Sequence, residues 1–347
     1  GNIIISDVVK PEAKEAIDSL RENGVSNIVM LTGDRKEAGE KVAAELGLDK
    51  AYTDLLPGDK VTKVEELLAH EHKNEKLAFV GDGINDTPVI ARSDVGFAMG
   101  SGTEAAKEAG KIVILDDNFK SIKDAILYGR TIYHNILKFC KFQLVINVAA
   151  VVVSAIAPFF GVDEPLKVTH LLFVNLVMDG LGAMMLGNEP AKEEYMAEAP
   201  RKRDESIVSK KMMGQILTMG IWLTVVSFIY LKVPFFVNLF ANEEQHLTGY
   251  FVLFIVAALF NGFNVRDDGF AIFAGLNENK DFIKVFLIII IVQALLVNAA
   301  IVPLAPFQWI GEMFSCVPFG IKGWIAVVLL ACTMIPADMV RKLCVNK

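Results

Sequence analysis

Two short segments in the first part of the chain combine glycine with carboxylate side chains. Thr32-Gly33-Asp34 follows the apolar run 28–31, and Gly81-Asp82-Gly83-Ile84-Asn85-Asp86 follows the apolar run 77–80. Glycine lets a backbone turn sharply and approach a ligand closely. Asp82 and Asp86 place two carboxylates, the hard oxygen ligands that Mg²⁺ prefers, in one loop. We therefore expect a magnesium site at the second segment.

A lysine lies between these two segments. Lys60 opens a predicted helix over 60–70, and its ammonium group could contact a phosphate as a point charge. Each feature alone also has a structural interpretation: Thr32-Gly33-Asp34 as a turn, Asp86 as the cap of a helix from Thr87, and Lys60 as a solvated surface residue. Two acidic loops that each follow a strand, with a lysine between them, instead favour phosphoryl chemistry.

A parallel sheet is expected to position these loops. Short β-branched or apolar runs alternate with helical patterns, and such alternation predicts an α/β domain with helices on both faces of a parallel sheet. Ligands of such sheets bind at the carboxyl ends of the strands. The predicted strands are 3–5, 27–31, 77–80 and 111–115, and the predicted helices are 11–23, 35–46, 60–70 and 103–109.

The rest of the chain is strongly apolar. Of 347 residues, 53% are hydrophobic and 22% are charged, and the apolar residues concentrate after residue 141. A membrane-spanning helix needs about 20 apolar residues. Six stretches come close to this length and predict an all-α bundle of six transmembrane helices: 142–161, 168–187, 212–231, 247–265, 285–304 and 323–340. Six buried core helices of this length could not be covered by a soluble part of only about 140 residues.

The distribution of charge predicts orientation and excludes one class of partner. Lysines and arginines gather in the loops after the second and fourth spans and in the C-terminal tail, which places these segments, with the N-terminal domain, in the cytoplasm. The net charge of −7 argues against a nucleic-acid partner. The four cysteines have no metal-ligand spacing and are expected to be buried thiols.

Three polar residues fall within the first two predicted spans. Asn147 lies in the first span, and Asn175 and Asp179 lie in the second. They offer oxygen ligands, which suit a hard cation such as Ca²⁺, and neither span places a thiolate or an imidazole at mid-depth. An ionisable side chain at membrane depth is costly and indicates function. The alternative is a protonated Asp179 that forms a hydrogen bond between helices.

These segments together resemble the P-type cation-transporting ATPases. The resemblance rests on residues 30–34, 56–60, 80–88, 96–100 and 116–119, and it implies a phosphorylation domain of the haloacid-dehalogenase type with a Rossmann-like sheet. It implies that Asp82 binds Mg²⁺ and that Asn85 and Asp86 support the phosphate site. It also implies that Thr32, Gly33 and Asp34 line the phosphate and nucleotide side, that Lys60 contacts the phosphoryl group, and that ATP is the energy source.

The membrane half resembles one branch of that family. Six helices after the phosphorylation domain are typical of the calcium and related pumps, and the membrane half looks like the plasma-membrane type of these. Residues 1 to 110, in contrast, look closer to the heavy-metal pumps. Ala150 and Ala258 stand where two-site calcium pumps carry further acids, which implies a single Ca²⁺ site. We expect a partial phosphorylation domain over 1–117, a stalk helix over 118–141 and the six spans within 142–343.

Several family features are absent from this sequence. It contains no Asp-Lys-Thr-Gly-Thr string, which carries the phosphorylated aspartate in the family, and no segment matching the nucleotide-binding domain, the actuator loop or the four leading helices. The first hypothesis is that the chain is the C-terminal portion of a calcium pump and lies in contact with membrane lipid. On this hypothesis it does not turn over ATP without the N-terminal half as a partner. The alternatives are a non-catalytic membrane protein or pump remnant that binds Mg²⁺ or phosphate, and a fragment of a heavy-metal (Zn²⁺ or Cd²⁺) pump.

Overall fold

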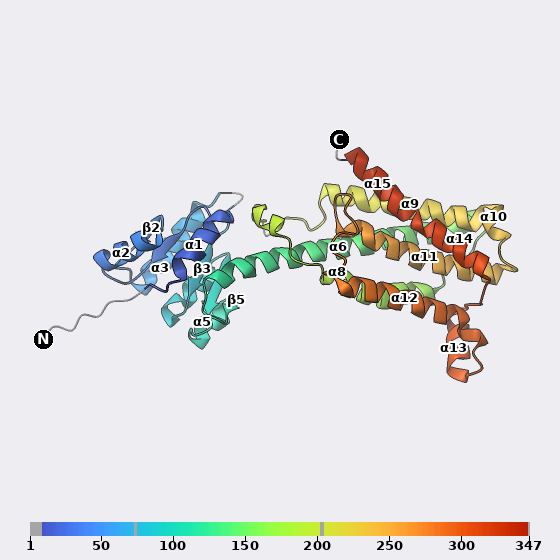
Figure 1. Ribbon diagram of the computed structural model, residues 1–347, viewed down its shortest axis with the longest axis horizontal. Coiled ribbons are helices and arrows are strands. Elements are labelled where there is room, and N and C mark those ends of the chain that lie inside the picture. The colour runs from blue at the N-terminus through green and yellow to red at the C-terminus, as the bar shows by residue number, and fades with distance from the viewer. Residues whose placement is uncertain (1–8, 73–74, 202–204, 346–347) are drawn as a thin grey trace. The chain divides into compact units, whose positions relative to one another are not determined.

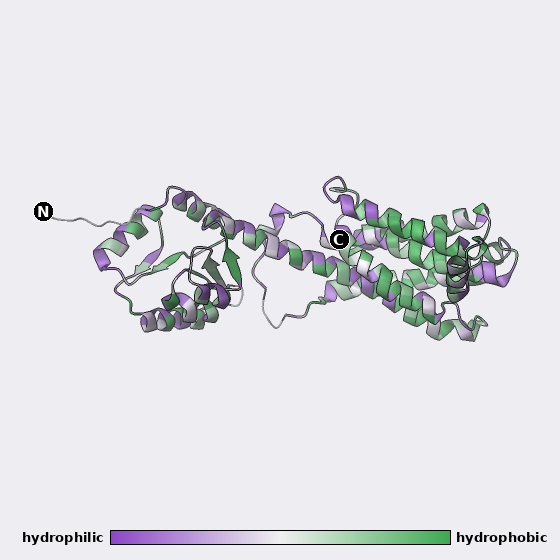
Figure 2. Ribbon diagram, turned by 90° about the horizontal axis from the view of Figure 1, so that it is seen from below, coloured by the Kyte–Doolittle hydropathy of each residue, from purple (hydrophilic) through white to green (hydrophobic). Residues whose placement is uncertain are grey.

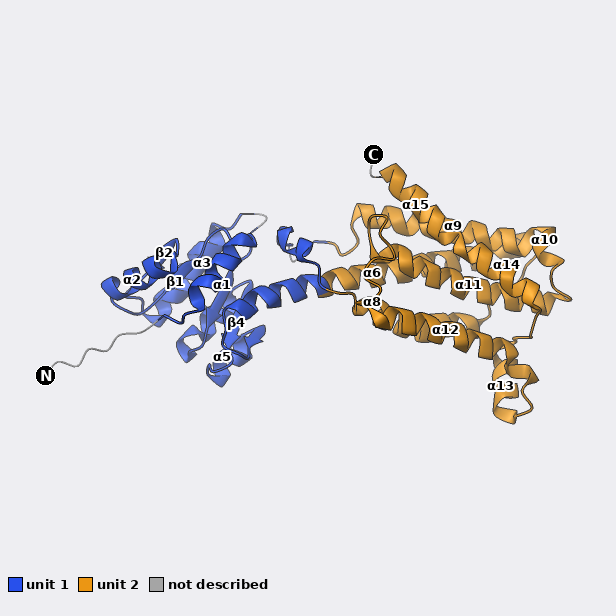
Figure 3. Cartoon of the chain, in the orientation of Figure 1, with its two compact units in different colours: residues 1–131, 191–205 blue, residues 132–190, 206–347 orange. Residues whose placement is uncertain are grey.

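The computed structural model describes residues 9–72, 75–201 and 205–345. Contacts divide the chain into two compact units (Figure 3). Unit 1 comprises residues 1–131 and 191–205, and unit 2 comprises residues 132–190 and 206–347. The predicted strand over 3–5 lies outside the described residues.

Unit 1 is an α/β unit whose strands pair in parallel (Figure 1). The described strands form two sheets, β1 with β2 and β3 with β4 and β5, so the parallel pairing predicted from the alternating pattern is confirmed. The strands are β1 (Val29–Leu31), β2 (Lys50–Tyr52), β3 (Ala78–Gly81), β4 (Val95–Met99) and β5 (Ile112–Ile114). The helices are α1 (Ala13–Glu22), α2 (Lys36–Leu46), α3 (Pro57–Ala69), α4 (Thr87–Arg92) and α5 (Glu104–Ala109).

Helices cover both faces of the larger sheet. Phe97 and Ala98 are neighbours on β4, so they point to opposite faces, and both are almost completely buried. Phe97 belongs to a cluster with Leu20 of α1 and Ile122, whereas Ala98 packs with Ile90 of α4 and Ala106 of α5. The loop that follows β3 therefore begins at the end of a strand in a sheet that is covered on both faces.

Unit 2 is a bundle of helices built largely from apolar residues (Figure 2). The described residues contain six helices long and apolar enough to span a membrane, which confirms the predicted number: Lys120–Phe160, Val168–Gly187, Lys210–Lys232, Glu243–Arg266, Lys280–Ile301 and Ile321–Val345. They are built from α6 (Lys120–Ile156), α7 (Val168–Phe173), α8 (Asp179–Gly187), α9 (Lys210–Lys232), α11 (Glu243–Arg266), α12 (Lys280–Asn298), α14 (Ile321–Cys332) and α15 (Met334–Val345). The shorter helices α10 (Pro234–Val237) and α13 (Ala305–Phe314) connect them.

The second, fifth and sixth spans contain features that the predicted ranges do not include. The fifth ends at Ile301 rather than at residue 304, and a separate helix, α13, begins at Ala305. The sixth is divided at Thr333 into α14 and α15, because Pro336 in the first turn of α15 has no backbone N–H to donate to the preceding turn. The second contains a π-helical turn, Val174–Met178, between α7 and α8.

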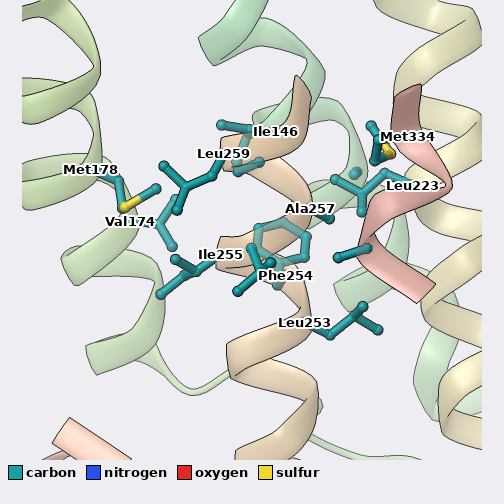
Figure 4. Close-up of a cluster of buried hydrophobic side chains, with 14 of the residues drawn as sticks. Ile146, Val174, Met178, Leu223, Leu253, Phe254, Ile255, Ala257, Leu259 and Met334 are labelled. Carbon is teal, nitrogen blue, oxygen red and sulfur yellow. The ribbon is translucent and has the colours of Figure 1, made fainter. Parts of the chain in front are cut away.

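Helix α11 is the centre of unit 2. In its most apolar stretch, 94% of the residues are buried inside the bundle, as expected for a helix that is apolar on all sides. Figure 4 shows side chains of neighbouring helices around it, with Val174 and Met178 on the side of Ile255 and Leu259. The π-helical turn therefore uses Val174 and Met178 to pack against the core of the bundle.

The expectation of four buried thiols is wrong for two cysteines. Cys316 is buried and Cys140 is half-buried, but Cys332 and Cys344 are exposed. Cys332 ends α14 and Cys344 lies in α15. The prediction rested on the absence of metal-ligand spacing, which does not indicate the face of a helix on which a cysteine lies.

Candidate functional site

The loop after β3 carries the acidic residues of unit 1. Gly81 ends β3, residues Ile84–Asp86 form a 3₁₀ turn, and α4 begins at Thr87. A Cβ atom at Gly81 would lie 2.7 Å from the Cβ of Asp86, so the loop can fold back on the strand only with glycine there. The loop therefore presents its carboxylates at the carboxyl end of a parallel strand.

Asp86 and Lys60 form the fixed part of this site. Asp86 is only 9% exposed, and its Oδ1 lies 2.9 Å from Nζ of Lys60 on α3. The other oxygen, Oδ2, accepts a hydrogen bond of 3.3 Å from the N–H of Gly83. One carboxylate thus joins α3 to the glycine loop, and the structure brings these three predicted residues together.

Asp82 and Asn85 occupy the outer side of the same loop. Both side chains are exposed, and within the described residues the Asp82 carboxylate forms no hydrogen bond or ion pair. The backbone of Asp82 is nevertheless held, because its C=O accepts a hydrogen bond of 2.8 Å from the N–H of Thr103. A carboxylate fixed at its backbone and free at its oxygens fits the hard-oxygen chemistry of Mg²⁺.

The segment that braces Asp82 is itself held by Asp117. The Oδ1 of Asp117 accepts a hydrogen bond of 2.9 Å from the N–H of Ser101, two residues before Thr103. This backbone hydrogen bond holds the pKa of Asp117 below its usual value, because it stabilises the charged form. Asp117 has φ of 53°, a left-handed conformation that aspartate tolerates better than most residues.

Thr32, Gly33 and Asp34 form a turn at the end of β1. The hydroxyl of Thr32 donates to Oδ2 of Asp34 at 2.7 Å and accepts from the N–H of Asp34 at 3.0 Å. Backbone hydrogen bonds from Asp54 and Leu55 tie the turn to the segment after β2. Among the described residues, no hydrogen bond or ion pair joins this turn to the Asp82 loop.

In unit 2 the structure pairs Asp179 with a residue that the sequence analysis did not single out. Asp179 is the first residue of α8, lies near the middle of the span Val168–Gly187, and is 9% exposed. Its Oδ2 accepts a hydrogen bond of 2.6 Å from Nε2 of Gln143 on α6. Gln143 lies four residues before Asn147 on one helix face, and this spacing of amides within an apolar span is the signal that could have identified it.

The two predicted asparagine ligands have different surroundings. Asn147 on α6 is half-buried, whereas Asn175, on the π-helical turn, is exposed. The exposure of Asn175 follows from the packing of that turn, because Val174 and Met178 take the side that faces the core. Their role as ligands beside Asp179 stays a prediction.

A buried polar cluster holds α6 and α8 together at one end of unit 2. Glu189 lies just after α8, and its Oε1 accepts from Nε of Arg266 at 2.7 Å and from Nδ2 of Asn279 at 2.6 Å. Lys138 of α6 approaches its other oxygen at 3.7 Å. Asn135 of α6 donates to the backbone C=O of Glu189 at 3.0 Å. Each of these five side chains is at most 6% exposed, so a set of charges and amides fixes the relative position of α6, α8, α11 and α12.

The fold and these sites define a class of protein: a haloacid dehalogenase-like unit joined by a helix to a membrane bundle with a buried carboxylate. Residues 1–94 match the family model for haloacid dehalogenase-like hydrolases, and residues 163–344 match that for the C-terminus of cation-transporting ATPases. The second match covers more than half of the chain. The chain belongs to the cation-transporting ATPase family, and it is a membrane protein.

Individual relatives agree with this family. The chain is 31% identical to the plasma membrane calcium-transporting ATPase mca-1 of Caenorhabditis elegans over 94% of this chain and 29% of that protein. It is 31% identical to calcium-transporting ATPase 9, plasma membrane-type, of Arabidopsis thaliana over 98% of this chain and 34% of that protein. The chain therefore spans about a third of the length of these relatives. The solved catalytic domain of the CPx-ATPase CopB-B matches 34% of this chain and 45% of its own at 31% identity, with a TM-score of 0.31.

Proposed function

We propose that this chain forms the cation-carrying membrane helices and part of the phosphorylation domain of a pump that uses ATP to move Ca²⁺ across a membrane. The observation that carries this proposal is the buried carboxylate of Asp179 in the middle of an apolar span. One amide donor, Gln143, leaves the negative charge of this carboxylate in place, and a bound cation would neutralise a charge that is costly at that depth. The names of the relatives, which are calcium-transporting ATPases, support Ca²⁺ as the ion.

The proposed ion site consists of Asp179, Asn147 and Asn175. Their oxygens are hard ligands, which suit Ca²⁺ better than Zn²⁺ or Cd²⁺. Ala150 and Ala258, both buried, offer no side-chain oxygen, which favours one Ca²⁺ per cycle. Ca²⁺ normally takes six to eight oxygen ligands, so backbone carbonyls, water or the remainder of the pump must supply the others.

Unit 1 is proposed to hold Mg²⁺ and phosphate. The Asp82 carboxylate would bind Mg²⁺, which neutralises the charge of a phosphoryl group when it is bound. Lys60 would contact the phosphoryl group, and Asp86 keeps Lys60 directed toward the Asp82 loop through the contact of 2.9 Å. Asn85, Gly81 and Gly83 would support the phosphate, and Thr32, Gly33 and Asp34 would line the nucleotide side.

The proposed pump requires parts that this sequence does not contain. No Asp-Lys-Thr-Gly-Thr string is present, so the phosphorylated aspartate must come from an N-terminal portion that acts as a covalent or noncovalent partner. Without it we expect no ATP turnover. Both termini of the described chain are proposed to lie in the cytoplasm, where the lysine-rich and arginine-rich loops are expected.

Complementation tests the proposal. The chain is co-expressed in membranes with the N-terminal portion of a calcium pump that carries Asp-Lys-Thr-Gly-Thr, and Ca²⁺-dependent ATP hydrolysis is measured. We expect activity that is lost in Asp179→Asn and in Asp82→Asn and kept in Gln293→Met, a buried amide of α12 outside both sites. Activity that survives Asp179→Asn, or that responds to Zn²⁺ and not to Ca²⁺, would refute the proposed ion site.

A further inference from the structure

The contact between Gln143 and Asp179 joins two helices of unit 2 at membrane depth. The donor is the amide Nε2 of Gln143 on α6, and the acceptor is Oδ2 of Asp179 at the start of α8. The donor and acceptor atoms lie 2.6 Å apart, and a hydrogen bond to an ionised carboxylate is stronger than one between neutral groups. Gln143 is half-buried and Asp179 is buried, so little water competes for either group.

The approach of α6 to α8 is set by contacts on both sides of this hydrogen bond. Phe142, next to Gln143, is completely buried, and a Cβ atom added at Gly182 of α8 would lie 2.8 Å from its ring. Seven residues before Phe142, Asn135 donates to the backbone C=O of Gly187 at 2.9 Å. These contacts hold the two helices in one register, so the Gln143 amide meets Asp179 through packing of the whole helix pair.

The hydrogen bond leaves most of the carboxylate available to a ligand. A carboxylate has about four lone-pair sites, and the Gln143 amide uses one of those on Oδ2. Oδ1 and the second lone pair of Oδ2 can still bind a cation. Asn147 lies one helical turn beyond Gln143 on α6, so one helix supplies both the donor that orients Asp179 and a proposed ligand.

We infer that Gln143 is a positioning residue for the transported cation: its amide fixes the Asp179 carboxylate in the orientation that binds the ion. This inference rests on the proposed function of Asp179. Outer-shell donors to metal ligands fix the orientation of the ligand, and their loss typically weakens metal binding by about 10- to 100-fold. Loss of the Gln143 donor should weaken Ca²⁺ binding by a factor in this range.

The test uses the full chain complemented with the N-terminal portion of a calcium pump in lipid nanodiscs, and it measures Ca²⁺ binding by equilibrium dialysis at neutral pH. Gln143→Met keeps the length of the side chain and removes the donor, and we expect Ca²⁺ affinity to fall by about 10- to 100-fold. Gln143→Asn keeps the amide but is one methylene shorter, and it carries the test if the methionine variant does not fold. The matched control is Gln293→Met, the same substitution at a buried amide of α12.

A spectroscopic measurement separates positioning from a structural role. The Ca²⁺-induced infrared difference spectrum should contain a carboxylate band that disappears in Asp179→Asn, which assigns the band to Asp179. In Gln143→Met the band should shift, because the carboxylate has lost a hydrogen bond. A structural role alone would lower the melting temperature and leave the band in place.

The outcomes distinguish the two proposals. If the wild-type chain and Asp179→Asn bind Ca²⁺ equally or not at all, the proposed ion site fails and this inference fails with it. If Asp179→Asn weakens binding but both Gln143 variants match Gln293→Met, the ion site stands and the positioning role is overturned. Tighter Ca²⁺ binding by Gln143→Met would also overturn it, because the amide would then compete with the ion.

Discussion

Replacing Arg266 with methionine should make unit 2 much easier to unfold, because it leaves a buried carboxylate without its main partner. The side chains of Arg266 and Glu189 are 3% and 4% exposed, and Nε lies 2.7 Å from Oε1. The guanidinium also donates to the backbone carbonyls of Ile272 at 2.9 Å and Ala274 at 3.1 Å. Methionine has an apolar side chain of similar length and lacks all of these donors.

The expected loss follows from what remains around Glu189. Removing one partner of a buried ion pair costs about 3–5 kcal/mol, because the other charge stays desolvated. Here Asn279 still donates to Glu189 at 2.6 Å and Lys138 lies 3.7 Å away, so part of the charge stays compensated. We therefore expect a decrease in the free energy of unfolding near the lower end of that range, at about 3 kcal/mol.

The assay is reversible unfolding of the full chain in mixed micelles, followed by circular dichroism. Lys211→Met is the matched control, because Lys211 pairs with Asp268 at 3.9 Å with both side chains more than half exposed. Such a pair contributes about 0–1 kcal/mol. Adding Glu189→Gln to Arg266→Met should recover part of the loss, because the uncompensated charge is gone. Equal decreases in the free energy of unfolding for Arg266→Met and Lys211→Met would refute the proposed role of the buried ion pair. A decrease for the double variant equal to the sum of the decreases for the two single variants would refute it as well.

Two further variants test the helix pair and the brace of the Asp82 loop. Gly182→Ala places a Cβ 2.8 Å from the ring of Phe142 and should destabilise unit 2 by about 1–3 kcal/mol in the same unfolding assay. Gly180→Ala should cost less than half as much, because a Cβ there would meet no atom of another described element within 4 Å. Equal losses would contradict the close packing at Gly182. The pKa of Asp117 is lowered by the Ser101 N–H, so its contribution to stability is present above the unfolded pKa of about 3.9 and is lost as the pH falls through the lower folded value. Asp117→Asn should therefore reduce the acid dependence of unit 1 unfolding, and an unchanged acid profile would show that this hydrogen bond contributes nothing.

Local sequence features predicted the parts of the molecule that depend on neighbouring residues. The loop at Asp82 was identified because glycines and carboxylates directly follow an apolar run. The six spans were identified because length and apolarity are properties of continuous segments, and their number is confirmed. Strands β2 and β4 were missed, since Lys50–Tyr52 is short and partly polar, and Gly96 interrupts the pattern in β4.

The features that were not predicted depend on residues far apart in the chain. Gln143 and Asp179 are 36 residues apart, and Arg266 and Glu189 are 77 apart. Such pairs form only when the helices pack in one register, and no local pattern specifies that register. The same holds for Asn175, since its exposure follows from the choice of Val174 and Met178 as the core face of the π-helical turn.

A structure of the complemented pump, determined by electron cryomicroscopy in Ca²⁺, tests the proposed role of Asp179 directly. We expect density for one ion at about 2.3–2.6 Å from a carboxylate oxygen of Asp179, within reach of the amide oxygen of Asn147. Gln143 should still donate to the same carboxylate. An ion bound elsewhere, or an Asp179 side chain directed into lipid with no ion beside it, would show that Asp179 does not bind the transported ion.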